Sequence, residues 1–230
     1  MTPVLEVEGL CFAFDRGRAV LEGISLVVHA GECVGIVGAN GAGKSTLLWR
    51  LLGLLKGRGS VRWFGQASRR APVSRIGVVF QNPEDQLFMP SVLEDVALGL
   101  INRGRGPAAA RAQALEALRE AGLQAVAARP AAELSLGERK RAAIAAALVT
   151  SPELLILDEP TAELDGRSAR LLGALLASLP VARLIASHDL DFLAKLCSRL
   201  LVLAEGRVIA EGPAAAVLND TPLLERAGLV

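Results

Sequence analysis

The chain carries a glycine-rich stretch, residues 38–45, that fits the pattern G-x-x-x-x-G-K-S. An apolar run, residues 33–37, precedes it, and an apolar-periodic segment, residues 47–52, follows it. Strand, glycine-rich turn and helix in this order form the context in which the pattern binds phosphate. Backbone N–H groups curl around phosphate oxygens there, and the helix N-terminus adds the positive end of its dipole. We predict that Lys44 neutralises β- and γ-phosphate oxygens and that the Ser45 hydroxyl is a ligand of Mg²⁺. The nucleotide contacts expected from this loop are Gly38, Asn40, Gly41, Ala42, Gly43, Lys44, Ser45 and Thr46.

Two adjacent carboxylates, Asp158 and Glu159, follow the apolar run 154–157. Four apolar residues in a row predict a strand that is buried on both faces. Because open α/β sheets bind ligands at the carboxyl ends of their strands, we expect both carboxylates to lie at the phosphate site. The alternative is a pair of surface acids at a strand end.

The segments that must position these residues predict an α/β fold. Helical periodicity from residue 90 to about residue 151 interrupts a pattern that is otherwise rich in strands. We therefore predict one domain, in which residues 1–83 and 152–230 form the nucleotide-binding core with an antiparallel β-subdomain, and residues 84–151 form an inserted helical subdomain. Strands are expected over 4–14, 24–29, 60–64, 76–80, 154–157, 183–187, 200–203 and 207–211, and helices over 92–100, 108–121, 138–149 and 167–179, with a short helical tail.

Composition excludes several classes of protein. The 230 residues carry a formal net charge of +1, so global charge gives no reason to expect nucleic acid as a partner. The basic cluster 139–141 is expected to be a solvated face. No apolar stretch reaches the roughly 18–20 residues of a membrane span, and the N-terminus lacks the basic and apolar regions of a signal peptide. Hydrophobic residues nevertheless make up 52% of the chain, which permits an apolar docking face.

The chain has three cysteines and two histidines. No C-x-x-C occurs, so we expect buried thiols in place of disulfides. Two histidines cannot build a Cys/His metal cage, and any metal must therefore be bound by oxygen atoms.

Phe14 lies at the end of the first expected strand. An aromatic side chain at this position either stacks on an adenine ring or packs into the core. The sequence leaves both alternatives open.

Over essentially its whole length the chain resembles the ATP-binding cassette ATPases. The resemblance implies a RecA-like P-loop NTPase core, an antiparallel β-subdomain, an inserted helical subdomain, and hydrolysis of ATP with Mg²⁺. One residue of the pattern, Glu163, stands where the family usually has a small residue. The matching pieces, in order, are residues 38–45, Gln81, residues 134–138, Asp158 and Glu159, residues 162–165, and His188.

The resemblance gives individual residues a role. Asp158 is similar to the acidic residue that holds Mg²⁺, and Glu159 to the general base that polarises the attacking water. His188 resembles the switch histidine that hydrogen-bonds the γ-phosphate and orients Glu159. Gln81 is similar to the residue that ligates Mg²⁺ and senses the helical subdomain, and Asp165 to the loop residue that reports across a dimer interface.

Residues 134–138, Leu-Ser-Leu-Gly-Glu, are similar to the family signature Leu-Ser-Gly-Gly-Gln and depart from it at Leu136 and Glu138. The pattern S-x-x-E ahead of an apolar-periodic run is a capping box that begins a helix. Such a helix N-terminus, with Ser135 and Gly137 exposed, suits the γ-phosphate of a nucleotide held by another subunit. Because an acidic side chain pointing at ATP would be repulsive, we expect Glu138 to fold back into the cap.

Residues 81–88 and 92–99 are similar to the ATPases of energy-coupling-factor importers, which bring vitamins and cobalt or nickel ions into prokaryotes. A short single cassette resembles the cobalt/nickel and biotin branches, and we favour cobalt.

We expect a head-to-tail dimer of two ATPase copies, a transmembrane coupling subunit and a substrate-binding membrane subunit, with the chain peripheral at the cytoplasmic face of the cell membrane. Leu87, Phe88 and Met89 are expected to dock on the transmembrane partner, and inward packing of these side chains is the alternative.

Three other functions compete with this interpretation. A soluble cassette ATPase of DNA repair or translation would need an inserted coiled coil or two cassettes in one chain, and the sequence has neither. A small-molecule kinase on the same phosphate loop would leave residues 134–138 and His188 unexplained, and would show acceptor-dependent phosphoryl transfer. A non-hydrolysing regulatory ATP binder conflicts with the presence of Glu159 and His188.

Overall fold

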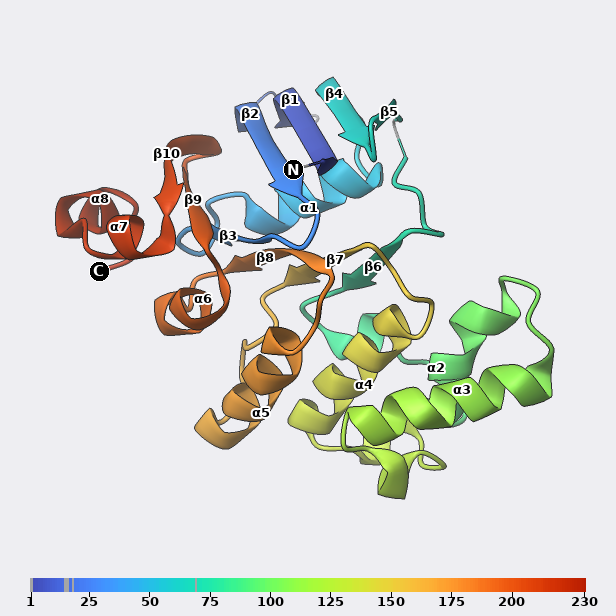
Figure 1. The fold of residues 1–230 in the computed structure, drawn as a ribbon. Helices are drawn as coiled ribbons and strands as arrows, with labels where there is room; N and C mark the ends of the chain where they lie inside the picture. Colours follow the sequence, from blue (N-terminus) through green and yellow to red (C-terminus); the bar gives the residue numbers. More distant parts are fainter. Residues whose placement is uncertain (1, 15–16, 18, 69) are drawn as a thin grey trace. The chain divides into compact units, whose positions relative to one another are not determined.

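A computed structural model describes residues 2–14, 17, 19–68 and 70–230 (Figure 1). The chain forms two compact units, one of Met1–Val73 with Pro180–Val230 and one of Ser74–Leu179. Each unit combines strands and helices, so the predicted α/β class is confirmed.

An antiparallel sheet of the first unit has the strand order β2-β1-β4-β5. The expected antiparallel pair is confirmed, with Val7 of β1 opposite Leu26 of β2. Apolar residues of β1 such as Val7 are buried while its neighbour Glu8 is exposed, the alternation of a sheet with one face on a core. The two-residue β5 was not predicted, because its exposed residues carry no periodic signal. The strands are β1 Pro3–Ala13, β2 Ala19–His29, β4 Arg58–Trp63 and β5 Gln66–Ala67.

A second set of strands in this unit carries the phosphate loop. β3 lies between β8 and β9 and is parallel to both, and β10 pairs antiparallel with β9. Every residue of β3 and β8 is buried, as continuous apolar runs in a parallel sheet require. The strands are β3 Cys33–Val37, β8 Ala182–Ser187, β9 Arg199–Ala204 and β10 Arg207–Pro213, and the helices are α1 Lys44–Leu52, α6 Leu190–Leu196, α7 Ala214–Leu218 and α8 Thr221–Arg226.

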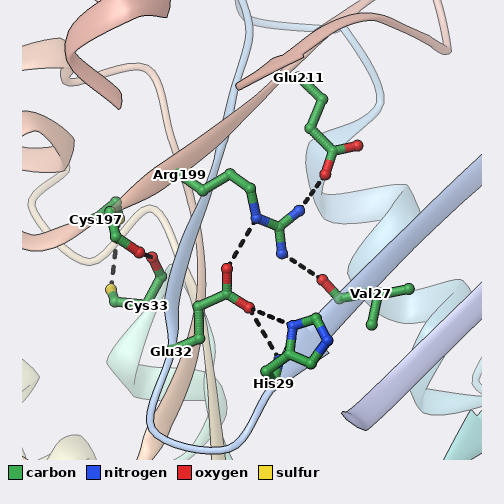
Figure 2. Close-up of polar contacts among 8 residues, drawn as sticks. Val27, His29, Glu32, Cys33, Cys197, Arg199 and Glu211 are labelled. Carbon is green, nitrogen blue, oxygen red and sulfur yellow. Dashed lines mark hydrogen bonds and ion pairs between the residues drawn. The ribbon is translucent and has the colours of Figure 1, made fainter. Parts of the chain in front are cut away.

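Arg199, at the start of β9, joins the ends of several elements of this unit (Figure 2). Its guanidinium donates to Oε1 of Glu32 (2.8 Å) and to the carbonyl oxygen of Val27 (2.6 Å), and it pairs with Glu211. Burial raises the pKa of Glu32, but hydrogen bonds from Arg199 and His29 outweigh burial and hold the pKa below its usual value. These bonds fix the starts of β3 and β9 against the end of β2.

Cys33 and Cys197 are buried free thiols whose Sγ atoms lie 3.5 Å apart, although 164 positions separate them in the sequence (Figure 2). Cys11 is a half-buried free thiol. The prediction of buried thiols is confirmed for Cys33 and Cys197 and is wrong for Cys11, which is only half-buried.

The second unit contains a parallel strand pair and a helical core. β6 (Ile76–Val79) pairs in parallel with β7 (Leu154–Asp158). Four helices of this unit are α2 Val92–Ile101, α3 Pro107–Glu120, α4 Leu136–Leu148 and α5 Gly166–Ala177. The core between α2, α3 and α4 is rich in alanine, including Ala110, Ala114 and Ala142, which are fully buried. Small side chains let the helices approach closely. The subdomain boundaries expected at residues 84 and 151 stay a prediction.

Within the described residues, no helix combines the length and the apolar character needed to cross a bilayer.

Candidate functional site

The phosphate loop connects β3 to α1, as predicted. A Cβ atom at Gly38 would lie 2.4 Å from the carbonyl oxygen of Leu203, so only glycine fits this close approach. Gly41 and Gly43 have positive φ angles of 82° and 105°, which glycine adopts without strain. Gly43 is the N-cap of α1, so the helix begins at Lys44 and its N-terminal end faces the loop.

Lys44 is 6% exposed, and its ammonium donates to the carbonyl oxygens of Gly38 (2.8 Å) and Ala39 (3.2 Å). The positive charge is thereby held inside the curve of the glycine-rich loop. Ser45 and Thr46 follow on the first turn of α1 and are half-buried. Asn40, Gly41 and Ala42 are among the residues that line an open depression of about 860 Å³.

Phe14 is 55% exposed, whereas Phe12 is buried. The two rings make an edge-to-face contact, with centroids 4.8 Å apart and an interplanar angle of 83°. Core packing therefore applies to Phe12 and not to Phe14, whose ring has an exposed face. The stacking of Phe14 on adenine stays a prediction.

His188 follows β8 and is exposed. The next residue, Asp189, accepts a hydrogen bond from the backbone N–H of Phe192 (3.0 Å) and caps α6. The backbone N–H of Asp189 also donates to the Ser187 hydroxyl (3.1 Å). His188 therefore lies between a buried strand and a capped helix, two elements that fix its backbone. Helix α6 was not predicted from the sequence.

Asp158 and Glu159 lie at the carboxyl end of β7 in the second unit and are 4% and 5% exposed. The alternative of two surface acids is wrong, since both residues are buried. Glu159 has a positive φ of 43°, a conformation that costs a non-glycine residue about 1–3 kcal/mol. Backbone strain of this kind is concentrated at functional sites.

Gln81 is exposed and lies just after β6. The segment that follows it is attached to α4 of the same unit. Glu84 pairs with Arg139 at 2.7 Å, and the side-chain amide of Gln86 donates to the carbonyl oxygens of Val78 (3.1 Å) and Ala143 (3.3 Å). The contacts of Glu84, Gln86 and Arg139 were not predictable from the sequence, because polar residues in a turn carry no signal of their partners.

Ser135 is the N-cap of α4 and forms a complete capping box with Glu138, so the prediction that Glu138 folds back is confirmed. The expectation that Gly137 is exposed is wrong. Gly137 is buried, and a Cβ atom there would lie 2.6 Å from the Ser168 hydroxyl on α5. Asp165 caps α5 and accepts hydrogen bonds from the backbone N–H of Ser168 (2.9 Å) and from its hydroxyl (2.8 Å).

Leu87, Phe88 and Met89 do not behave as one apolar surface. Leu87 is 6% exposed and packs in the helical core, so its expected docking role is wrong, whereas Phe88 is 70% exposed. The backbone N–H groups of Phe88 and Met89 both donate to Oδ1 of Asp95 at 2.9 Å. Burial raises the pKa of Asp95, and these two hydrogen bonds act in the opposite direction. Asp95, which the sequence analysis did not single out, fixes the backbone that presents Phe88.

The candidate residues divide between the two units. The phosphate loop, Phe14 and His188 belong to the first, and Gln81, Ser135, Gly137, Asp158, Glu159 and Asp165 belong to the second.

The chain belongs to the ABC transporter family, whose model matches residues 21–162, and it is an ATP-binding ATPase with the fold of that family. It is 46% identical to a protein of Gloeobacter violaceus that carries a provisional ABC transporter ATP-binding name, covering 100% of this chain and 97% of that one. Two proteins of Rhodobacter capsulatus have names that state a substrate. The cobalt import ATP-binding protein CbiO is 42% identical and the nickel import ATP-binding protein NikO 41% identical, over 100% of this chain and 85% and 97% of theirs. The solved structure of cbiO1 from Clostridium perfringens, described as part of the ABC transporter complex cbiONQ, matches with a TM-score of 0.85 and 34% identity, over 100% of this chain and 96% of that one.

Proposed function

We propose that the chain is the ATP-hydrolysing subunit of an energy-coupling-factor importer for cobalt or nickel ions. The observation that carries the proposal is the similarity over the whole chain to proteins named for cobalt import and nickel import. An importer of biotin or another vitamin is the alternative, because in this class of importer a separate subunit binds the substrate.

In this proposal the phosphates of ATP lie in the loop of residues 38–45. Lys44 exchanges its hydrogen bonds to the Gly38 and Ala39 carbonyls for bonds to β- and γ-phosphate oxygens. The ammonium then faces full negative charges in place of carbonyl dipoles, which favours bound nucleotide. The exposed ring of Phe14 stacks on the adenine.

Glu159 accepts the proton of the attacking water, and His188 contacts the γ-phosphate and orients Glu159. The side-chain oxygens of Ser45, Gln81 and Asp158 are hard donors of the kind that Mg²⁺ prefers, so these three residues would hold the ion. Bound Mg²⁺ supplies charge neutralisation at the phosphate oxygens.

A second ATPase copy completes each site in this proposal. The N-terminal end of α4, with the exposed Ser135, approaches the γ-phosphate bound by the partner copy, and Asp165 reports across the interface. Glu138 is compatible with this role because its carboxylate is engaged by Ser135. A two-fold dimer gives two such composite sites.

A transmembrane coupling subunit and a substrate-binding membrane subunit complete the proposed assembly, which keeps the chain peripheral at the cytoplasmic face of a prokaryotic membrane. Phe88 is the apolar side chain best placed for docking on the coupling subunit, since its ring is exposed and its backbone is fixed by Asp95. No role in nucleic-acid binding is proposed, given the near-neutral net charge.

The proposal is tested by purifying the tagged chain from detergent-solubilised membranes and measuring uptake of radiolabelled cobalt, nickel and biotin. We expect two membrane proteins to co-purify, and deletion of the chain to abolish cobalt or nickel uptake. Wild type should restore uptake, and Lys44→Ala should not. Loss of biotin uptake alone would favour the vitamin alternative, and recovery of the chain with ribosomes or DNA in place of membrane proteins would contradict the proposal.

A further inference from the structure

Lys140 lies in the second turn of α4 and is 3% exposed, so the expectation that the basic cluster 139–141 is a solvated face is wrong for this residue. Its ammonium donates to the carbonyl oxygen of Ala162 (2.8 Å) and to that of Glu159 (3.2 Å). Both acceptors belong to the turn that connects β7 to α5 in the same unit. A single side chain of α4 therefore contacts two points of the turn that carries Glu159, its first residue and Ala162.

Burying an ammonium group opposes folding unless hydrogen bonds and opposite charges compensate. Burial lowers the pKa of Lys140, while the carboxylates of Glu163 and Glu159 act in the opposite direction. An apolar side chain of similar length would fill the same space without this desolvation cost, and such replacements of buried charges are often neutral or stabilising. Packing alone therefore does not account for a lysine at this position.

The turn that Lys140 contacts is conformationally strained. Glu159 and Glu163 both have positive φ angles, 43° and 63°, which non-glycine residues adopt only when surrounding contacts enforce them. Within the turn, the N–H of Ala162 donates to the carbonyl of Glu159 (3.1 Å). Lys140 donates to the carbonyls of the same two residues that this hydrogen bond joins. These bonds therefore oppose a change of the turn to a less strained backbone conformation.

We propose that Lys140 is a positioning residue for Glu159: by binding the carbonyls of Glu159 and Ala162 from α4, it fixes the backbone from which the Glu159 carboxylate projects. Through this contact, α4, the helix that Ser135 caps, also determines the placement of Glu159. The inference rests on the proposed role of Glu159 as the general base.

The test compares three variants of the full-length chain. Lys140→Met keeps an unbranched apolar stem without a donor, Lys140→Gln keeps N–H donors without the charge, and Lys195→Met is a control that removes an exposed lysine from α6. ATP affinity is measured by equilibrium binding, and kcat and KM by phosphate release. Because a misplacement of about 1 Å can lower turnover by about 10²-fold, we expect kcat of Lys140→Met to fall by about 10- to 100-fold with ATP affinity unchanged. Lys140→Gln should recover part of the loss, and Lys195→Met should match wild type.

A double variant separates this inference from the proposed role of Glu159. If Lys140 acts through Glu159, adding Lys140→Met to Glu159→Gln lowers single-turnover hydrolysis no further. The positioning role would be overturned if Lys140→Met lowered hydrolysis by the same factor in the Glu159→Gln background as in wild type, or if Lys140→Met alone kept the wild-type kcat. Either result would leave the role of Glu159 as general base intact. Normal turnover in Glu159→Gln alone would instead overturn the proposed base. If Lys140→Met fails to fold, Lys140→Gln replaces it, alone and combined with Glu159→Gln, and the same results support or overturn the positioning role.

Discussion

Ser135 and Glu138 engage each other at the start of α4. The backbone N–H and the hydroxyl of Ser135 donate to Oε2 of Glu138, at 2.8 and 2.7 Å, and the N–H of Glu138 donates to the Ser135 hydroxyl at 3.3 Å. The hydrogen bonds from the Ser135 hydroxyl and N–H hold the pKa of Glu138 below its usual value. The acidic departure from the family signature is therefore part of the helix cap.

Removing the Glu138 carboxylate should destabilise the chain modestly and change its response to acid. We expect Glu138→Ala to lower the free energy of unfolding by about 1 kcal/mol, because the helix loses half of its capping box. Glu138→Gln should lose less, since an amide oxygen still accepts the two bonds. Because the folded-state pKa is lowered, the stabilising contribution of ionised Glu138 is present above the unfolded-state pKa and is lost as pH falls through the folded-state pKa. In urea titrations, the difference between wild type and Glu138→Gln should thus shrink below about pH 4.5. A difference that stays constant with pH would contradict the charged cap.

Glu159→Gln should separate ATP binding from ATP hydrolysis. The substitution keeps the size of the side chain and removes its basicity, so we expect retained affinity and a fall in turnover of about 10²-fold or more. Lys44→Ala should instead weaken ATP binding, because it removes the cation next to the phosphates. Binding of a fluorescent nucleotide and phosphate release from the same preparations provide the two measurements. Near-normal turnover of Glu159→Gln would exclude it as the general base.

The parts of the site that depend on short stretches of sequence could be predicted from residue types and their spacing. The phosphate loop follows from glycine spacing between an apolar run and a helix, and the buried β7 follows from residues 154–157. The capping box at Ser135 and Glu138 was also predictable, because both partners lie within one turn of the helix.

Contacts between distant segments were not predictable from the sequence. Lys140 looks like part of a solvated basic cluster, and only the fold brings it to the Glu159 carbonyl, 19 residues away. Leu87 and Phe88 are adjacent apolar residues, yet one is buried and the other exposed, because Asp95 fixes the backbone between them. Single-sequence patterns carry no signal for such tertiary constraints.

Glu163 offers a test of backbone strain in the turn after Glu159. Its φ of 63° is unfavourable for a residue with a Cβ atom, and glycine removes that cost while losing more entropy on folding. We expect Glu163→Gly to raise the free energy of unfolding by about 0.5–1 kcal/mol. Glu116→Gly is the matched control on α3, where glycine should destabilise the helix. Thermal and urea unfolding provide the measurement. If both substitutions destabilise the chain, the side-chain contacts of Glu163 stabilise the fold by more than its backbone strain destabilises it, and the prediction is wrong.

Phe88 and Leu87 should respond in opposite ways to the same substitution. Phe88→Asp introduces charge on an exposed ring position, so we expect unchanged folding and ATP affinity but loss of co-purification with the membrane subunits and loss of uptake. Leu87→Asp buries an unpaired carboxylate in the helical core. We expect it to lower the free energy of unfolding by about 3 kcal/mol or more, enough to unfold a protein of low stability. Leu54→Asp is the matched control, since Leu54 is exposed to a similar degree (64%) in the other unit. If Phe88→Asp assembles and transports normally while Leu54→Asp does not, the docking surface belongs to the first unit and the assignment of Phe88 is wrong.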